Sequence, residues 1–227
     1  MKQTRQPDHL ASSLTDLMTS LMVIFVLLLV ARLNNQAGMR AAAAAELEHR
    51  LGRYTQQSGQ QVSVGRAKED PNTIVINIPN TLLNFDSQDY RLKPAGQQFL
   101  ESNIPAWAGI LCAADIRPNI DTVVVEGHAD QTRWQGSSFE ESKEKNLTLS
   151  QQRSMAVVGR SLDILKTQPA ARDCFLEKLS ATGRGEEEPA DPEHPDSERN
   201  RRVVFKIRLR PELVGDVEES LKRTVRP

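Results

Sequence analysis

The sequence predicts an α+β protein with a single N-terminal transmembrane helix and stalk, followed by a β-α-β-α-β-β domain. Three observations predict this fold: an uncharged apolar run over Leu17–Ala31, an Ala- and Glu-rich stretch over 36–57, and β-branched strands alternating with amphipathic helices beyond residue 63. The 227 residues suffice for one or two domains. The net charge of −1 gives no basic field, so we expect no nucleic-acid partner.

The apolar run is short for a membrane span. Its fifteen residues rise about 22 Å as a helix, against roughly 30 Å of hydrocarbon. We therefore predict a span over 12–33, preceded by a short segment, 1–11, and followed by a helical stalk or plain spacer over 34–62. A cleaved signal peptide is the alternative, but the small residues suited to cleavage lie at 41–45, well past the run.

The predicted span includes a carboxylate, Asp16, near its front. Such a group costs about 2–3 kcal/mol at the membrane centre and less near the edge. Because a buried acid resists ionisation, Asp16 could take up an ion and later release it. Thr19 and Ser20 lie three and four residues on, where their hydroxyls could help to bind it. The alternative is an Asp16 that only caps the helix at the membrane surface.

The domain is predicted over 63–210. Three stretches rich in β-branched residues predict strands: Thr73–Ile78, Asp121–Gly127 and Arg202–Arg210. Leu176–Gly183 leads into a further strand. Two stretches with apolar faces predict helices: Lys93–Leu111 and Leu147–Lys166. Between them, 131–145 is predicted to be a polar loop, and 211–227 a C-terminal helical tail. This order fits a mixed sheet with helices on one face.

Metal and enzyme chemistry have little support in the sequence. The two cysteines, Cys112 and Cys174, are far apart, and the four histidines show no metal-ligand spacing. No nucleophile is accompanied by a base in a recognisable motif. We therefore expect no metal site, no cofactor and no enzymatic activity.

Three motifs of the domain carry a resemblance: VEGHADQT at 125–132, NLTLSQQRSMAV at 146–157, and GRGEEEPADP with RNRRVVFKI between 183 and 207. In order and local spacing they resemble the OmpA-like peptidoglycan-binding domain, which occurs in outer-membrane protein A and in the flagellar stator protein MotB. The resemblance implies that Asp130 and Arg153 hold the diaminopimelate of the wall peptide, and that Asn146 and Arg201 match further residues of the family motif.

The chemistry of these residues is compatible with that role. A ligand with an ammonium and a carboxylate on one carbon suits an acid, Asp130, beside the donor fork of Arg153. From spacing alone, the two could equally pair with one another across the fold. One departure from the family is the loop from Gln131 to Lys145, which is longer and more acidic than in many members and could alter ligand access.

A transmembrane acid joined to such a domain is the layout of MotB-type stator subunits, and SLTDLMTSLMVIFVLLLVA is similar to their Asp-containing helix. The segment lacks the Tyr-Ala that precedes the Asp in flagellar MotB. It is more similar to ZorB, the MotB-like subunit of the Zorya anti-phage defence system. The resemblance implies a homodimer inside a ring of a multi-pass MotA/ZorA-like partner, with H+ or Na+ passing Asp16. A flagellar-type stator and a passive membrane-to-wall tether remain alternatives.

A wall-binding domain also implies a location. The chain is expected in the bacterial inner membrane as a single-pass protein, with 1–11 in the cytoplasm and the domain in the periplasm. Cys112 and Cys174 would then lie in an oxidising compartment, each after a predicted helix of the same domain. A disulfide between them is one expectation, and two buried free thiols are the other.

Overall fold

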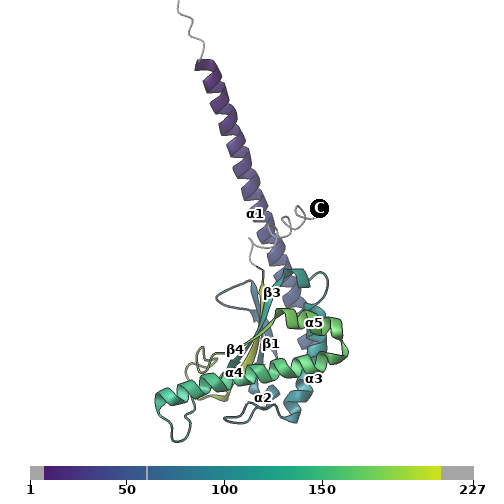
Figure 1. Cartoon of the computed structure of the whole chain (residues 1–227), viewed down its shortest axis with the longest axis vertical. Helices are drawn as coiled ribbons and strands as arrows, with labels where there is room; N and C mark the ends of the chain where they lie inside the picture. The colour runs from purple at the N-terminus through teal and green to yellow at the C-terminus, as the bar shows by residue number, and fades with distance from the viewer. Residues whose placement is uncertain (1–7, 60, 211–227) are drawn as a thin grey trace, which may run out of the picture. The chain divides into compact units, whose positions relative to one another are not determined.

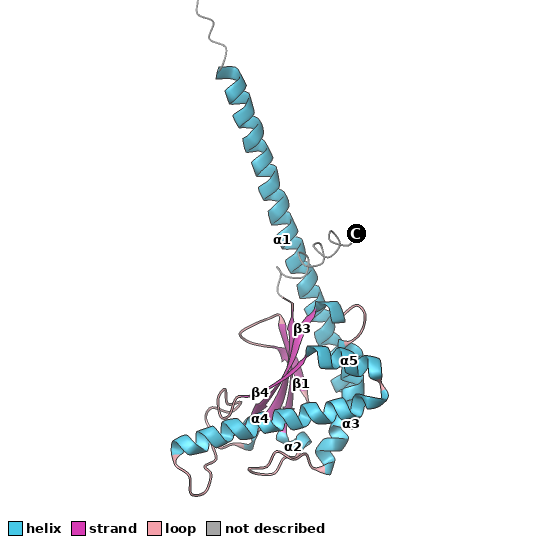
Figure 2. Ribbon diagram, in the orientation of Figure 1, coloured by secondary structure: helices cyan, strands magenta, loops and turns pink. Residues whose placement is uncertain are grey.

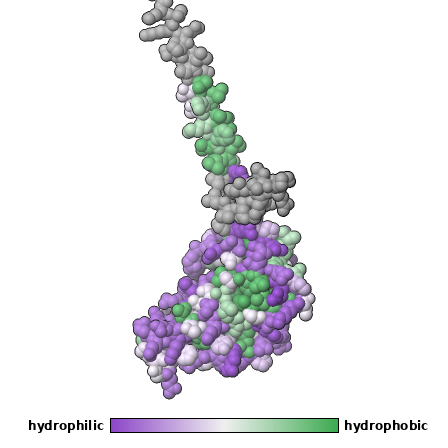
Figure 3. Space-filling view, in the orientation of Figure 1, coloured by the Kyte–Doolittle hydropathy of each residue, from purple (hydrophilic) through white to green (hydrophobic). Residues whose placement is uncertain are grey.

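The structure, a computed structural model, describes residues 8–59 and 61–210 and divides at Ala41/Ala42 into two compact units. The described chain begins with a long helix, α1 (Asp8–Ser58) (Figure 1). Among the described residues, one segment, Leu14–Arg32, is long and apolar enough to cross a membrane (Figure 3). Its nineteen residues rise about 28 Å, close to the thickness of the hydrocarbon core. Most of the predicted N-terminal segment, 1–11, and all of the predicted tail, 211–227, lie outside the described residues.

The second unit is built on a five-stranded mixed sheet (Figure 2). Its strands are β1 (Ser63–Arg66), β2 (Thr73–Pro79), β3 (Ile120–His128), β4 (Leu179–Gly183) and β5 (Arg202–Leu209). Their spatial order is β1-β2-β5-β3-β4, with β3 and β4 parallel and the other pairs antiparallel. The last strand in the sequence therefore lies between β2 and β3, and alternate residues of β2 and β5 face the core.

Helices pack against this sheet (Figure 2). They are α2 (Asn80–Leu83), α3 (Pro94–Leu111), α4 (Phe139–Ile164) and α5 (Pro169–Lys178), with 3-10 turns at Arg117–Asn119, Leu165–Thr167 and Glu198–Asn200. The indole of Trp107 on α3 lies edge-to-face against Phe99 and Phe205, with ring centroids 6.2 and 5.6 Å away. The contact with Phe205 ties α3 to β5, the central strand of the sheet. Pro105 lies inside α3 without ending it.

The predicted polar loop over 131–145 is wrong in its second half. Helix α4 begins at Phe139 because Ser138 caps it. The Ser138 hydroxyl accepts a hydrogen bond from the Glu141 backbone N–H, at 3.3 Å, and the Glu141 carboxylate accepts one from the Ser138 N–H, at 2.8 Å. The loop is thereby shortened to 131–138, and α4 gains two turns over the predicted helix. Three short elements, β1, α2 and α5, were not predicted either.

The predicted stalk is not a plain spacer in its second half. Ala44, Leu47 and Leu51 are fully buried in the core of the domain. On the same part of α1, Arg50 forms an ion pair with Asp115 at 2.5 Å, and the Tyr54 hydroxyl donates to the Ser102 carbonyl at 2.9 Å. The domain therefore begins near Ala42, well before the predicted boundary at residue 63.

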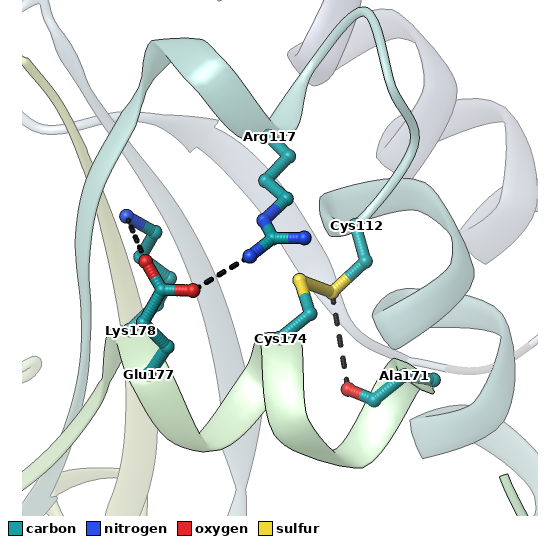
Figure 4. The surroundings of a disulfide bond; sticks show 6 residues. All are labelled: Cys112, Arg117, Ala171, Cys174, Glu177 and Lys178. Atoms are coloured by element: carbon teal, nitrogen blue, oxygen red, sulfur yellow. Dashed lines mark hydrogen bonds and ion pairs between the residues drawn. A yellow bond between two sulfur atoms is a disulfide. The ribbon is translucent and has the colours of Figure 1, made fainter. Parts of the chain in front are cut away.

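A disulfide joins Cys112, at the end of α3, to Cys174 in α5 (Figure 4). The two residues are 62 apart in sequence, and their Cα atoms are 6.1 Å apart. Beside the bridge, the Arg117 guanidinium donates to the Glu177 carboxylate at 2.7 Å. The structure therefore contains the expected disulfide between these cysteines and not two free thiols.

Candidate functional site

Two glycines bring α4 unusually close to the sheet. A Cβ atom at Gly127 would lie 2.1 Å from the Ser150 carbonyl oxygen, and one at Gly183 would lie 2.5 Å from the Gln151 nitrogen. Ser150 itself is fully buried, and its hydroxyl accepts from the Gly185 N–H at 2.8 Å. Because the backbones of β3, β4 and α4 meet here, residues just after β3 lie beside the buried face of α4.

Asp130 and Asn146 meet at this junction. Asp130 follows the end of β3 and is 8% exposed, and its Oδ1 accepts from the Thr132 N–H at 3.3 Å. The Asn146 amide donates to the Asp130 carbonyl at 3.2 Å and to the Glu186 carboxylate at 3.3 Å. The backbone around Asp130 is therefore fixed, and one of its carboxylate oxygens faces the charged groups described next.

Arg201 is the cation nearest to Asp130. Its Nε lies 3.5 Å from Asp130 Oδ2, and its Nη2 lies 2.6 Å from the Glu198 carboxylate. The Nε atom is buried and makes no hydrogen bond within the described residues. At 3.5 Å the contact with Asp130 is therefore an ion pair, too long and poorly aligned for a good hydrogen bond.

Arg153 is buried on the inner face of α4 and is only 2% exposed. Its Nε donates to the Asp89 carbonyl at 3.0 Å, its Nη2 donates to the Asp86 carbonyl at 2.8 Å, and the guanidinium lies 5.2 Å from the Phe85 ring centre. Burial, together with the charge of Arg201, lowers the pKa of Arg153 to about 10, while Asp130 and Asp89 act in the opposite direction. Arg153 therefore stays charged at neutral pH.

The structure thus brings the four residues Asp130, Asn146, Arg153 and Arg201 into one neighbourhood, in which carboxylates lie close to guanidinium groups. The charge of Asp130 acts on Arg153, where it opposes the lowering of the Arg153 pKa, but within the described residues Asp130 forms its ion pair with Arg201. The expectation that Asp130 and Arg153 merely pair with one another is therefore not what the structure contains. A site with adjacent charges of both signs is suited to a zwitterionic ligand.

Two further side chains join the site that the sequence did not single out. Glu186 is 8% exposed and accepts from Asn146, and the Trp134 indole N–H donates to Asn146 Oδ1 at 2.8 Å. Glu186 stands within the acidic motif at 183–192, and Trp134 is one of two tryptophans in the chain. An indole in an otherwise polar stretch was the signal that could have marked Trp134.

A buried charged cluster lies on the neighbouring strands. Glu126 Oε1 is 3.0 Å from His128 Nε2 and 2.6 Å from Lys206 Nζ. Burial favours the neutral acid, but the hydrogen bonds from His128 and Lys206 outweigh it and hold the pKa of Glu126 at about 2. Burial lowers the pKa of His128, opposed by its hydrogen bond to Glu126. The cluster anchors the end of β3 just before Asp130.

The candidate ion-binding residues lie in the first unit. Asp16 is exposed on the surface of α1. The Thr19 hydroxyl donates to the Thr15 carbonyl at 2.6 Å, as threonine often does in helices. The structure therefore does not join Thr19 to Asp16, although the hydroxyl oxygen can still accept or coordinate. Ser20 is exposed one residue further on. Within 8–59 and 61–210, no group of three or more His, Cys, Asp or Glu side chains is placed to hold a metal ion.

The chain is similar to a known protein family and to several solved structures. The model of the OmpA family matches residues 84–202, just over half of the chain. A search of the curated protein sequences returns no match. A solved MotB-like protein from Desulfovibrio vulgaris is similar with a TM-score of 0.56 and 19% identity, over 78% of this chain and 97% of that protein.

Two further solved structures are similar at lower scores. The periplasmic domain of Helicobacter pylori MotB has a TM-score of 0.49 and 15% identity, over 74% of this chain and 94% of its own. The OmpA-like domain of FopA1 from Francisella tularensis has a TM-score of 0.41 and 17% identity, over 66% and 83%. The predicted α+β fold with its N-terminal apolar helix is confirmed by the family match and by the likeness to the Desulfovibrio vulgaris structure, which at 19% identity concerns the fold alone.

Proposed function

Because the chain belongs to the OmpA family, we propose that it is a MotB-like stator subunit of an ion-driven rotary motor, anchored to peptidoglycan. The observation that carries this proposal is one helix, α1, which contains a segment able to span a membrane and then enters the core of an OmpA-family domain. A chain so built can hold a membrane assembly to the cell wall.

The ligand proposed for the domain is the diaminopimelate of the wall peptide. Its ammonium suits Asp130, and its carboxylate suits Arg201 and Arg153. The Nε of Arg201 is buried without a hydrogen bond within the described residues, so a ligand oxygen there would satisfy it. In Arg153, Nε and Nη2 are engaged by loop carbonyls, which leaves Nη1 as the donor for a ligand.

The motor part of the proposal concerns Asp16. Protons or sodium ions would pass this carboxylate at the boundary with a ring of a multi-pass MotA/ZorA-like partner, inside which two copies of this chain would stand. We propose the Zorya anti-phage system, and within it the ZorB role, as the setting, with a flagellar-type stator as the second candidate. No cofactor is proposed beyond the transported ion.

The alternative class is a passive tether that binds the wall without moving ions. Asp16 lies eight residues after the start of α1, so the alternative in which it only caps the helix is not what the structure contains. The substitution Asp16→Asn separates the motor from the tether, because Asn is nearly isosteric but cannot gain and lose a proton. A motor variant should insert and bind peptidoglycan normally, yet lose phage protection, or motility in a flagellar setting. Each charge that crosses 100 mV releases about 2.3 kcal/mol, and that supply would stop.

The measurement is phage plaquing or swimming, beside a pull-down of the same full-length variant with cell-wall sacculi. Met22→Leu, at an exposed residue of the same segment that has no proposed role in ion binding, is the matched control for the insertion of an altered helix. Full protection or motility from Asp16→Asn would refute the motor and leave the tether.

A further inference from the structure

A cleft with a volume of about 700 Å³ lies beside the site. It is bounded by the loop over 87–91, by Trp134, and by the face of α4 that carries Lys145, Leu149 and Gln152. Cavities of about 300–1,000 Å³ are the usual size for small-ligand sites. The cleft shares Trp134 with the candidate site, and Asp130, Asn146, Arg153 and Arg201 do not line it.

Both walls of the cleft are fixed by residues of the candidate site. Arg153 donates to the carbonyls of Asp86 and Asp89, which holds the loop that forms one wall. Asn146 accepts from the Trp134 indole, which holds the other wall. The walls of the cleft are therefore held in place by residues of the candidate site, and the cleft adjoins that site.

The charges that line the cleft cancel. Asp89 is paired with Arg91, whose Nη2 lies 2.7 Å from its Oδ2, and Glu144 is matched by Lys145. A cleft without net charge favours a neutral ligand over a zwitterion or a phosphate. The lining also offers neutral hydrogen-bonding groups, the amides of Gln88 and Gln152 and the hydroxyl of Thr148.

Aromatic surface completes the lining. Tyr90 is 45% exposed, so its ring is open to a ligand. Trp134 is half-buried, and the Lys145 ammonium lies 5.6 Å from its ring centre. An aromatic ring beside neutral amides suits a pyranose, whose C–H face packs on the ring while its hydroxyls bond to the amides.

We propose that this cleft is a second subsite, which takes a neutral sugar ring of the peptidoglycan glycan strand next to the peptide held at Asp130. The inference rests on the proposed function and deepens it, because it assigns the two chemical parts of the wall to two adjoining parts of the domain. Tyr90 and Gln152 are the residues that contact the sugar, and Arg153 and Asn146 position the walls.

Two probes separate the parts of the ligand: glycan strands stripped of peptide by an amidase, with the carboxylates that the amidase frees converted to amides so that the strands are neutral, and the free stem peptide. The full-length chain in detergent micelles should bind both. Tyr90→Ala with Gln152→Ala should weaken binding of the stripped strands by about tenfold and leave the stem peptide unaffected. Phe139→Ala is the matched control, since Phe139 is an aromatic residue of similar exposure, 47%, that does not line the cleft.

The possible results distinguish a failure of the sugar subsite from a failure of the proposed function. Wild-type chain that binds the stem peptide but not the stripped strands overturns the subsite alone, and so does a double variant that binds the strands as the wild type does. Equal weakening by Phe139→Ala also overturns it, because the effect would not be local to the cleft. Wild-type chain that binds neither probe nor intact sacculi overturns the proposed function, and the subsite with it.

Discussion

At the scale of single residues, the site depends on charges held in place by neutral contacts. Asp130 is fixed through its backbone by Asn146, and Arg153 is fixed by two loop carbonyls. The charged atoms are therefore oriented before any ligand arrives, which reduces the entropy that binding must overcome.

The substitution Asp130→Asn tests the acid without changing its size. The amide can still accept from the Thr132 N–H, but it cannot balance a ligand ammonium, and charge-assisted hydrogen bonds contribute about 1.5–3 kcal/mol. We expect sacculus binding of the full-length chain to weaken by about 10- to 100-fold. Arg153→Ala should act in the same direction.

The matched control is Asp121→Asn, because Asp121 is exposed near the start of the same strand, β3. Binding is measured by co-sedimentation with sacculi, and thermal melting checks that each variant is folded. Folded Asp130→Asn and Arg153→Ala proteins that sediment like the wild type would exclude this site.

The buried cluster of Glu126 and His128 predicts how stability depends on pH. Both groups have a lower pKa in the folded state than their ordinary values of 4.5 and 6.5, so the unfolded state binds more protons as the pH falls. Stability should therefore be full above pH 6.5, fall first as unfolded His128 becomes protonated, and fall again between pH 4.5 and about 2 through Glu126. Neighbouring Arg202 also disfavours charge on His128.

The measurement is the melting temperature of the full-length chain from pH 8 to pH 3. In Glu126→Gln the decline below pH 4.5 should be shallower than in the wild type, whatever the absolute stability of the variant. A melting temperature that rises as the pH falls below 6.5 would contradict the assignment.

At the scale of elements, α1 belongs to the core as well as to the membrane segment. Leu51 is fully buried, although the sequence around it reads as an ordinary spacer helix. Leu51→Ala should destabilise the domain by about 2–5 kcal/mol, because it removes buried methyl groups and leaves a cavity. Gln56→Ala on the same helix is the control, since Gln56 is exposed.

Chemical denaturation monitored by tryptophan fluorescence measures this difference, because Trp107 lies in the same core. A Leu51→Ala variant as stable as Gln56→Ala would mean that this part of α1 is a spacer after all, as the sequence first suggested.

Sequence reasoning found the elements whose signal is local. Runs of β-branched residues predicted β2, β3 and β5, and Pro94 predicted the start of α3. The capping box of Ser138 and Glu141 is also a local sequence signal, but the acidic composition of residues 131–145 led to the prediction of a loop there. The docking of Leu47 and Leu51 could not be predicted, because two leucines on one helical face do not say what they pack against.

The candidate site was less predictable than the fold. The motifs named Asp130, Asn146, Arg153 and Arg201, and the structure brings them together. No periodicity could show that Arg153 bonds the carbonyls of Asp86 and Asp89, which are more than sixty residues away. Because every residue has a backbone carbonyl, the sequence does not indicate which carbonyls accept hydrogen bonds from Arg153. The loop that forms one wall of the cleft could therefore be identified only from the structure.

At the scale of the whole molecule, the proposal requires one orientation in the membrane. Basic residues flank the span on both sides, so charge alone does not set it. If the domain grips the wall, a phosphatase fused after residue 227 should be active, because that reporter folds only outside the cytoplasm. A fusion in which only a cytoplasmic reporter works would exclude the wall-binding role.

The place of β5 in the sheet has a consequence for biogenesis. Among the five described strands this one is synthesised last, yet it lies between β2 and β3, which do not pair with each other. Until residues 202–209 have been synthesised, no strand connects the pair β1-β2 to the pair β3-β4, so the five-stranded sheet cannot form. An exported chain would thus remain threadable through a translocation channel until β5 has been synthesised, and the sheet would close only after this strand has crossed the membrane.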